Sequence, residues 1–232
     1  LPAIALAARH GGVEALLAAF TGTLSVMAIL LSEGQSAQLA LLVGVLAASI
    51  ALLPIAGRLV AGVCIVGVLA MPLLVKSLDT GPVHRALSNL PSANAVHRVA
   101  LWVGYQSILR ERPIMGWGAG AARHAGMTGR ATEVAVERGY PRVATSPHNA
   151  PLEIWTELGL IGAALTSMLL WFVGAAIDRQ RGEVRVALTF FFASAATYSF
   201  VSSSLFQGWW LSSLAMALVA CFMLEFRRKN PA

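Results

Sequence analysis

The sequence predicts an all-α fold in which several helices cross a membrane. Of its 232 residues, 57% are hydrophobic and 12% are charged, and the mean hydropathy is +0.70. A soluble domain carries about 25% charged residues, so this chain has too few polar side chains to cover a water-soluble surface. Apolar stretches recur along the chain, most of them close to the roughly 20 residues that a helix needs to cross a bilayer. We therefore predict a polytopic transmembrane helix bundle.

Six apolar stretches are the candidate spans. They cover residues 13–31, 37–53, 59–75, 151–177, 186–204 and 211–224, of which the second and third are short. Residues 1–8 resemble the end of an apolar span, so we expect earlier helices to precede this chain. The predicted regions are N-terminal transmembrane helices at 1–76, a long loop at 77–150 and C-terminal transmembrane helices at 151–232.

Basic residues in the short loops indicate how the spans are oriented. When the spans are counted, Arg9, Arg58 and the basic segments at 178–185 and 227–229 all fall on one side. The positive-inside rule places that side in the cytoplasm. The short turns on the other side hold no Lys or Arg. The long loop is therefore predicted to be extracytoplasmic.

The long loop, counted from the lysine at its start, carries a surplus of positive charge. Nine basic residues stand against four acidic ones. The basic residues are Lys76, Arg85, Arg98, Arg110, Arg112, Arg123, Arg130, Arg138 and Arg142. Because a guanidinium presents a planar fork of donors that suits phosphate, this surplus indicates an anionic ligand on the outer face. The alternative is a solvated loop that contacts anionic lipid headgroups. In a membrane protein, a net charge of +6 does not point to nucleic acid.

One helix is predicted within the loop. Residues 94–111 have a broadly amphipathic pattern, and Pro113 ends it. We expect this helix to lie along the membrane interface, with Trp102 and Tyr105 at the level of the headgroups. Three glycines spaced by two follow: Gly116, Gly118 and Gly120. With no strand before them they do not form a dinucleotide-binding fingerprint, and a flexible turn is the simpler interpretation.

The loop ends in His148-Asn149, where an apolar helix begins. Asn149 suits the cap of this helix and Pro151 suits its first turn. His148 then lies beside free backbone N–H groups and a helix dipole that favour an anion, and a neutral imidazole can accept a proton. Glu153 and Glu157 share one helical face and could orient His148 or an acceptor hydroxyl. From these residues alone, a capping or interface role for His148 is favoured over a catalytic one.

These features together resemble the O-antigen ligase/polymerase superfamily of bacterial membrane glycan transferases. Its ligases have His, then Asn, Ser or Gln, nine residues, Gly, two residues, and Gly, Thr or Tyr. His148, Asn149, Gly159 and Gly162 match this pattern. The superfamily's Pro-x-x-Gly-x-Gly-x-Gly turn is matched by residues 113–120.

A third motif extends the resemblance. An Arg followed four residues later by Leu or Trp opens the loop helix in the superfamily, and Arg98 and Trp102 match it. The similarity covers about residues 32–162. It departs at residues 32–37, where a Ser-Arg-Gly-Ala-like segment is common and no Arg is present. The candidates to replace that second diphosphate-binding arginine are Arg110, Arg112, Arg123 and Arg142.

The resemblance implies a GT-C type fold of about six spans with a long outer loop and an interfacial helix. It implies a metal-independent glycosyltransferase without a cofactor, in the bacterial inner membrane, whose active-site loop faces the periplasm. Such enzymes move a glycan from undecaprenyl diphosphate to an acceptor sugar, either as ligases to lipid A core or as O-antigen or exopolysaccharide polymerases. Carried over, Arg98 binds the diphosphate, His148 activates the acceptor hydroxyl, and Asn149 and Glu157 belong to the substrate site.

Two other classes of function are compatible with a membrane chain. A lipid-linked glycan carrier would place charged or broken helices near the membrane midplane, whereas the charges here gather in the outer loop. A non-catalytic membrane protein would be indifferent to Arg98→Ala and His148→Ala. An enzyme is the leading prediction, because positive charge stabilises a departing diphosphate and a base removes the proton of an attacking hydroxyl.

Overall fold

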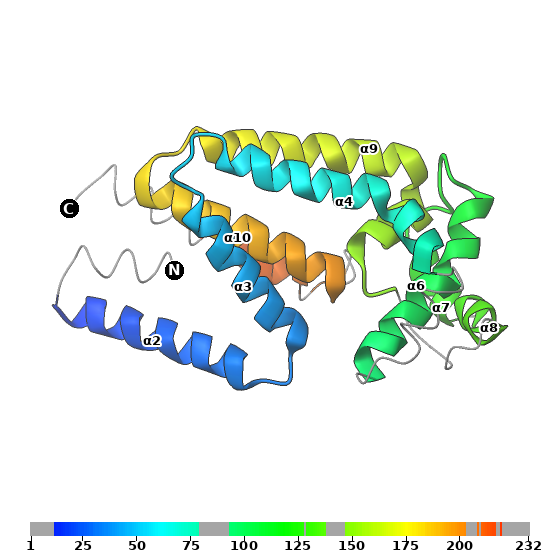
Figure 1. Ribbon diagram of the computed structural model, residues 1–232, viewed down its shortest axis with the longest axis horizontal. Coiled ribbons are helices and arrows are strands. Elements are labelled where there is room, and N and C mark those ends of the chain that lie inside the picture. The colour runs from blue at the N-terminus through cyan, green and yellow to red at the C-terminus, as the bar shows by residue number, and fades with distance from the viewer. Residues whose placement is uncertain are drawn as a thin grey trace. The chain divides into compact units, whose positions relative to one another are not determined.

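The computed structural model describes residues 12–78, 93–127, 129–137, 147–202, 208, 210–216 and 219, and over these residues it contains helices and no strand (Figure 1). The helices are α2 (Gly12–Leu31), α3 (Gln35–Ser49), α4 (Ala56–Leu78), α6 (Ala93–Glu111), α7 (Ala121–Met127), α8 (Arg130–Glu137), α9 (Ala150–Asp178) and α10 (Gly182–Val201). The predicted all-α fold is confirmed.

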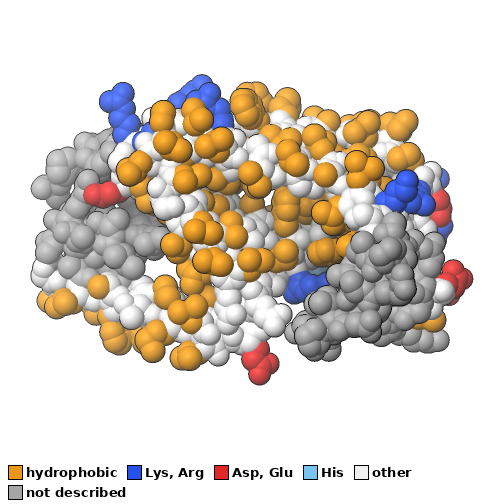
Figure 2. Space-filling view, viewed as in Figure 1, with side chains coloured by type: hydrophobic (Ala, Val, Ile, Leu, Met, Phe, Trp, Pro, Cys, Tyr) orange, Lys and Arg blue, Asp and Glu red, His pale blue; other side chains and the backbone are white. Residues whose placement is uncertain are grey.

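Three of these helices are long and apolar enough to cross a membrane. They are α4, α9 and α10, and shorter apolar helices run over Ala19–Leu31 and Gln35–Ser49. Large apolar side chains on them point outward, such as Val63, which is 74% exposed, and Phe172, which is 61% exposed. Figure 2 shows hydrophobic side chains spread over the visible face of these helices. An apolar surface this extensive is that of a protein surrounded by lipid.

Five of the six predicted spans therefore correspond to helices that the structure describes. Half of the sixth, at 211–224, lies outside the described residues, and so does all of the stretch at 1–8. By contact clustering the chain forms two compact units. One consists of Leu1–Ala61, Phe172–Tyr198 and Phe206–Ala232, and the other of Gly62–Trp171 and Ser199–Leu205.

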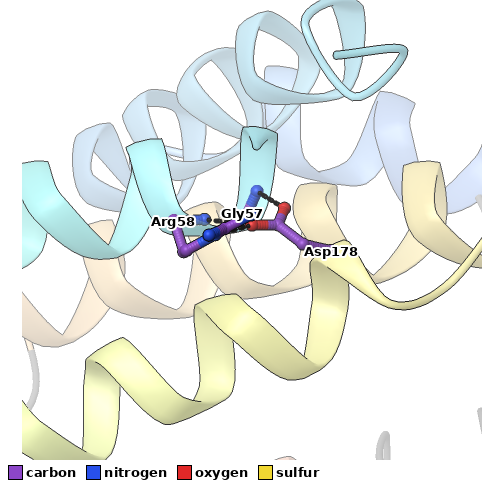
Figure 3. Close-up of polar contacts among 3 residues, drawn as sticks. All are labelled: Gly57, Arg58 and Asp178. Carbon is purple, nitrogen blue, oxygen red and sulfur yellow. Dashed lines mark hydrogen bonds and ion pairs between the residues drawn. The ribbon is translucent and has the colours of Figure 1, made fainter. Parts of the chain in front are cut away.

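In the first unit, the last residue of α9 caps the first turn of α4 (Figure 3). Asp178 accepts hydrogen bonds from the backbone N–H of Gly57 at 2.7 Å and from Nε of Arg58 at 2.6 Å. The first N–H groups of a helix have no partner within the helix, so a carboxylate there stabilises it. The contact confirms that the turn with Arg58 and the loop after Asp178 lie at the same end of their helices, as the charge pattern predicts. Which side of a membrane that end faces stays a prediction.

The same end of the two helices is closely packed, because glycines lie at the contact. A Cβ atom on Gly57 would lie 2.3 Å from the carbonyl oxygen of Gly174, and one on Gly174 would lie 2.6 Å from that of Gly57. Small residues at such a crossing let two backbones approach in a membrane, where apolar burial alone gives helices no reason to associate.

We expect Asp178→Ala to destabilise the protein. The substitution leaves the N–H groups of α4 and the guanidinium of Arg58 without their carboxylate, at a cost of about 2 kcal/mol. The measurement is the midpoint of thermal unfolding in detergent. Glu33→Ala, which removes an exposed acid from the turn after α2, is the control. Equal midpoints for the two variants would contradict the capping role.

In the second unit, α6 is the central helix. Leu101 and Tyr105 are fully buried, and the hydroxyl of Tyr105 donates to the carbonyl of Ala122 at 2.6 Å. Gly104 lies against α8, where an added Cβ would be 2.2 Å from the carbonyl oxygen of Ala131. Tyr105 is therefore not an exposed anchor at the lipid headgroups, because its side chain packs inside the protein and its hydroxyl bonds to a protein acceptor.

Candidate active site at the start of α9

Asn149 begins α9 as its N-cap residue, as the sequence predicts. Its Oδ1 accepts the backbone N–H of Leu152 at 2.9 Å, and its carbonyl accepts that of Glu153 at 3.0 Å. The side chain is buried, so the capping bond is shielded from water. The side chain and carbonyl of Asn149 thus bind the first turn of α9. This anchors the backbone next to His148, the residue that precedes Asn149.

His148 has an unusual backbone conformation. Its φ is 47°, and among the described residues it is the only non-glycine residue with a positive φ. His and Asn enter this left-handed region more readily than most side chains, although at some cost in strain. The neighbouring backbone is held in place, because Nε1 of Trp102 donates to the carbonyl of Pro147 at 3.1 Å. The loop helix and the start of α9 together therefore fix the position of the imidazole.

The structure brings His148 and Arg98 together. Burial lowers the pKa of His148 below its ordinary value of 6.5, and the positive charge of Arg98 lowers it further, as does that of nearby His97. Both causes disfavour a second positive charge at this place. The His148 ring is therefore neutral at pH 7, which is the state in which it can accept a proton.

A hydrogen bond with the backbone of Ser202 opposes these effects and raises the pKa of His148. A bond that favours the charged ring is one in which a ring N–H donates to a carbonyl oxygen. In a neutral imidazole, donation from one nitrogen makes the other nitrogen the acceptor. Ser202 and His97 both affect the pKa of His148, and neither was predicted from the sequence as part of the site. His97 could have been noted as the neighbour of Arg98, whereas no pattern marks Ser202.

The glycine turn and the helix break form a single feature. α9 is interrupted at Gly159, whose φ of 62° and ψ of −152° are not helical. The N–H groups of Trp117 and Gly118 donate to the carbonyls of Thr156 and Glu157, at 2.9 and 2.8 Å. In the other direction, the N–H groups of residues 160 and 161 donate to the carbonyls of residues 113 and 114, at 2.8 and 3.2 Å. The turn thus satisfies the backbone groups that the break releases.

Close contact explains why glycine is needed on both sides of this feature. A Cβ on Gly116 would lie 2.4 Å from the backbone of Glu157, and one on Gly159 would lie 2.5 Å from the carbonyl of Ile114. Small residues in a membrane helix often admit a neighbouring helix, and Gly159 and Gly162 do not serve that purpose here. The partner of Gly159 is the glycine turn, and the space beside Gly162 is filled by Leu158, one turn earlier in the same helix.

Glu157 anchors the glycine turn from inside the unit. Its side chain is 1% exposed, and its Oε1 accepts the backbone N–H of Ala122 at the start of α7, at 3.3 Å. Among the described residues its carboxylate accepts from the backbone N–H groups of Gly120, the last glycine of the turn, and Ala122. A direct role of Glu157 in binding substrate stays a prediction.

The other predicted arginines lie in different places. Arg110 is twelve residues after Arg98 on α6, which at about 1.5 Å per residue separates their backbones by roughly 18 Å. Arg112 stacks on the ring of Trp117, 4.2 Å from its centroid, and Arg123 is exposed on α7. Arg142 lies outside the described residues. Arg98 is thus the arginine that the structure places beside His148.

Metal ligands do not gather in the described part of the chain: it contains no group of three or more His, Cys, Asp or Glu residues placed to hold an ion.

The long apolar helices α4, α9 and α10 define the class of this protein, a multi-pass α-helical membrane protein. Residues 20–167 match the O-antigen ligase family. Because the match covers more than half of the chain, this protein belongs to the O-antigen ligase family. The matched region includes Arg98, the glycine turn, His148 and the break at Gly159.

Curated relatives agree with the family. A protein of Rickettsia conorii named "Putative polysaccharide ligase" is 28% identical over 175 residues, which is 74% of this chain and 42% of the relative. Proteins of the same name from Rickettsia prowazekii and Rickettsia felis are 28% identical over 163 residues and 27% identical over 174 residues. They align with 69% and 74% of this chain and with 40% and 42% of their own lengths. The aligned region thus spans about two-fifths of each relative. No solved structure matches the chain.

Proposed function

We propose that this chain carries the acceptor-activating part of a ligase-type membrane glycosyltransferase. The donor is a glycan on undecaprenyl diphosphate and the acceptor is a sugar hydroxyl, such as one on lipid A core. The observation that carries the proposal is the pairing of His148 with Arg98, in which a neutral, partly buried imidazole lies beside a guanidinium. The names of the relatives favour a ligase over a polymerase.

The chemistry requires one proton transfer and one substitution. The acceptor hydroxyl oxygen attacks the anomeric carbon, where a new C–O bond forms as the bond from that carbon to the diphosphate oxygen breaks. The hydroxyl proton moves to the accepting nitrogen of His148, which becomes an imidazolium. The lipid diphosphate leaves with the bonding electrons, and Arg98 stabilises its charge through paired N–H donors.

The proximity of the two residues couples donor binding to basicity. The charge of Arg98 lowers the pKa of His148. A bound diphosphate offsets that charge, so the pKa of His148 rises towards the value at which it accepts a proton most effectively. The base thus becomes stronger when the donor is present, and the imidazolium that forms is attracted to the departing diphosphate.

Substitution of Arg98 tests this proposal through the pH dependence of transfer. Activity needs neutral His148, so the rate falls as the pH drops through its pKa, which lies below 6.5 in the free protein. We expect Arg98→Gln to move this acid limb of kcat/KM to higher pH, because the pKa of His148 rises when the positive charge of Arg98 is removed. We also expect the KM for donor to rise by roughly tenfold or more, the cost of a charged hydrogen bond.

Arg98→Lys is the matched control. It keeps the positive charge and loses the planar fork. The acid limb should therefore stay near its wild-type position while donor binding still weakens. A limb that does not move in Arg98→Gln, measured in the full protein with defined donor and acceptor, would contradict the pairing.

A further inference from the structure

A cavity with cationic and apolar lining residues lies at the other end of α6, where α6 approaches the end of α4. Its volume is about 340 Å³, and its lining includes Lys76, Gln106 and Arg110 together with the apolar side chain of Leu73. All of these residues belong to the second unit. Its lining residues on α6, Gln106 and Arg110, lie roughly 12 and 18 Å along the helix from Arg98, so the cavity is separate from the proposed catalytic pair.

Gln106 is the buried donor of this cavity. The residue is 6% exposed, and its Nε2 has no hydrogen-bond partner in the part of the chain that the structure describes. A buried donor left without an acceptor destabilises the folded protein. An acceptor oxygen supplied from outside the protein would remove that cost.

The two cations at the rim favour an anionic acceptor. Lys76 and Arg110 are exposed, and neither forms an ion pair with any described acidic residue. The acid next to Arg110 in the sequence, Glu111, is paired with Arg130 instead. A lysine, an arginine and an amide N–H converging on one cavity are donors suited to the oxygens of a phosphate group.

An apolar strip leads away from the cavity along α4. Val66, Leu69 and Leu73 are 66%, 44% and 70% exposed. At about 100° per residue, Leu69, Leu73 and Lys76 share one face of the helix, with Val66 close to it. α4 is one of the helices long and apolar enough to cross a membrane. A ligand with a phosphate head and a hydrocarbon tail would match both the cavity and the strip.

We propose that this cavity binds the phosphate headgroup of an anionic lipid, with Lys76, Arg110 and Gln106 as donors and the acyl chain lying along α4. Such a lipid supplies both the phosphate oxygens for the polar donors and the hydrocarbon for the apolar strip on α4. A free phosphate ion would make the polar contacts and lack the apolar ones, and a zwitterionic lipid would bring its own positive charge close to two cations.

The test is lipid binding to the purified full protein in detergent, followed by native mass spectrometry. The probes are phosphatidylglycerol, phosphatidylcholine with the same acyl chains, and inorganic phosphate. We expect wild-type protein to bind phosphatidylglycerol at least about tenfold more tightly than either of the other two, because charged hydrogen bonds contribute about 1.5–3 kcal/mol each. Equal binding of phosphatidylcholine, or equally tight binding of inorganic phosphate, would overturn the proposal.

Two variants locate the site. Lys76→Gln combined with Arg110→Gln should reduce phosphatidylglycerol affinity by about tenfold or more, and Gln106→Leu should reduce it by several-fold. The matched control, Arg179→Gln combined with Arg181→Gln, removes the same charge from exposed positions in the loop after α9 and should leave the affinity unchanged. Loss of affinity in the control equal to that in the Lys76 and Arg110 variant would show a non-specific charge effect and reject the site. Unchanged affinity in the Lys76 and Arg110 variant would reject it equally.

Discussion

Replacing His148 with Asn is expected to reduce the rate of glycan transfer by about 10²–10⁴-fold, the contribution of a positioned general base. Asn is chosen because it tolerates the left-handed backbone that His148 adopts, with φ 47°. It cannot take up the proton of an attacking hydroxyl near neutral pH. The variant thus removes the base and keeps the backbone at the start of α9. The measurement is kcat for transfer by the purified full protein at saturating donor and acceptor.

His124→Asn is the control for this prediction. His124 is exposed on α7, and the same change of side chain there should leave kcat unaltered. The thermal midpoints of both variants should match that of the wild type, which separates a loss of chemistry from a loss of folding. Wild-type kcat in His148→Asn would remove His148 from the mechanism.

Replacing Gly159 with Ala is expected to have the largest effect on folding. The backbone at Gly159, with φ 62° and ψ −152°, lies in a region that is nearly restricted to glycine. The new Cβ would also lie 2.5 Å from the carbonyl of Ile114, so the glycine turn would have to separate from the break in α9. Backbone strain and the loss of paired hydrogen bonds together should cost at least about 3 kcal/mol. The measurement is thermal unfolding of the protein extracted from membranes.

Gly62→Ala is the matched control for that change. Gly62 lies within α4, and no atom lies within 4 Å of a Cβ built there. Alanine in such a position favours the helix by up to about 1 kcal/mol. The two variants add the same methyl group, so opposite shifts in the unfolding midpoint are expected. If Gly159→Ala is as stable as the wild type, the account of the broken helix is wrong.

The helices and the cap were predictable because their causes are local. Apolar stretches of the length of a bilayer, together with Asn149 and Pro151 at a loop end, depend on residues close together in the sequence. The pairing of the glycine turn with Gly159 was not predictable from the residues, since about forty positions separate the two segments and each alone fits a flexible turn or a small-residue contact.

The burial of Tyr105 was missed for a related reason. An amphipathic pattern shows that one face of a helix is covered, and does not show whether lipid or protein covers it. The interface assignment assumed lipid, whereas the acceptor for Tyr105 is the carbonyl of Ala122, seventeen residues further along. The pairing of Arg98 with His148 followed from the resemblance to a family. The residues alone favoured a capping or interface role for His148, and the Ser202 contact had no sequence signal.

The most direct test of the shared site is a double-mutant cycle on transfer by the full protein, with Arg98→Gln, His148→Asn and the pair combined. Residues that are far apart and share no partner give rate effects that multiply, while residues that act together give non-additive effects. We expect the double variant to lose much less than the product of the two single losses, because Arg98 acts partly through the proton affinity of His148. Multiplicative losses at every pH would show that the two residues act independently and would contradict a single site.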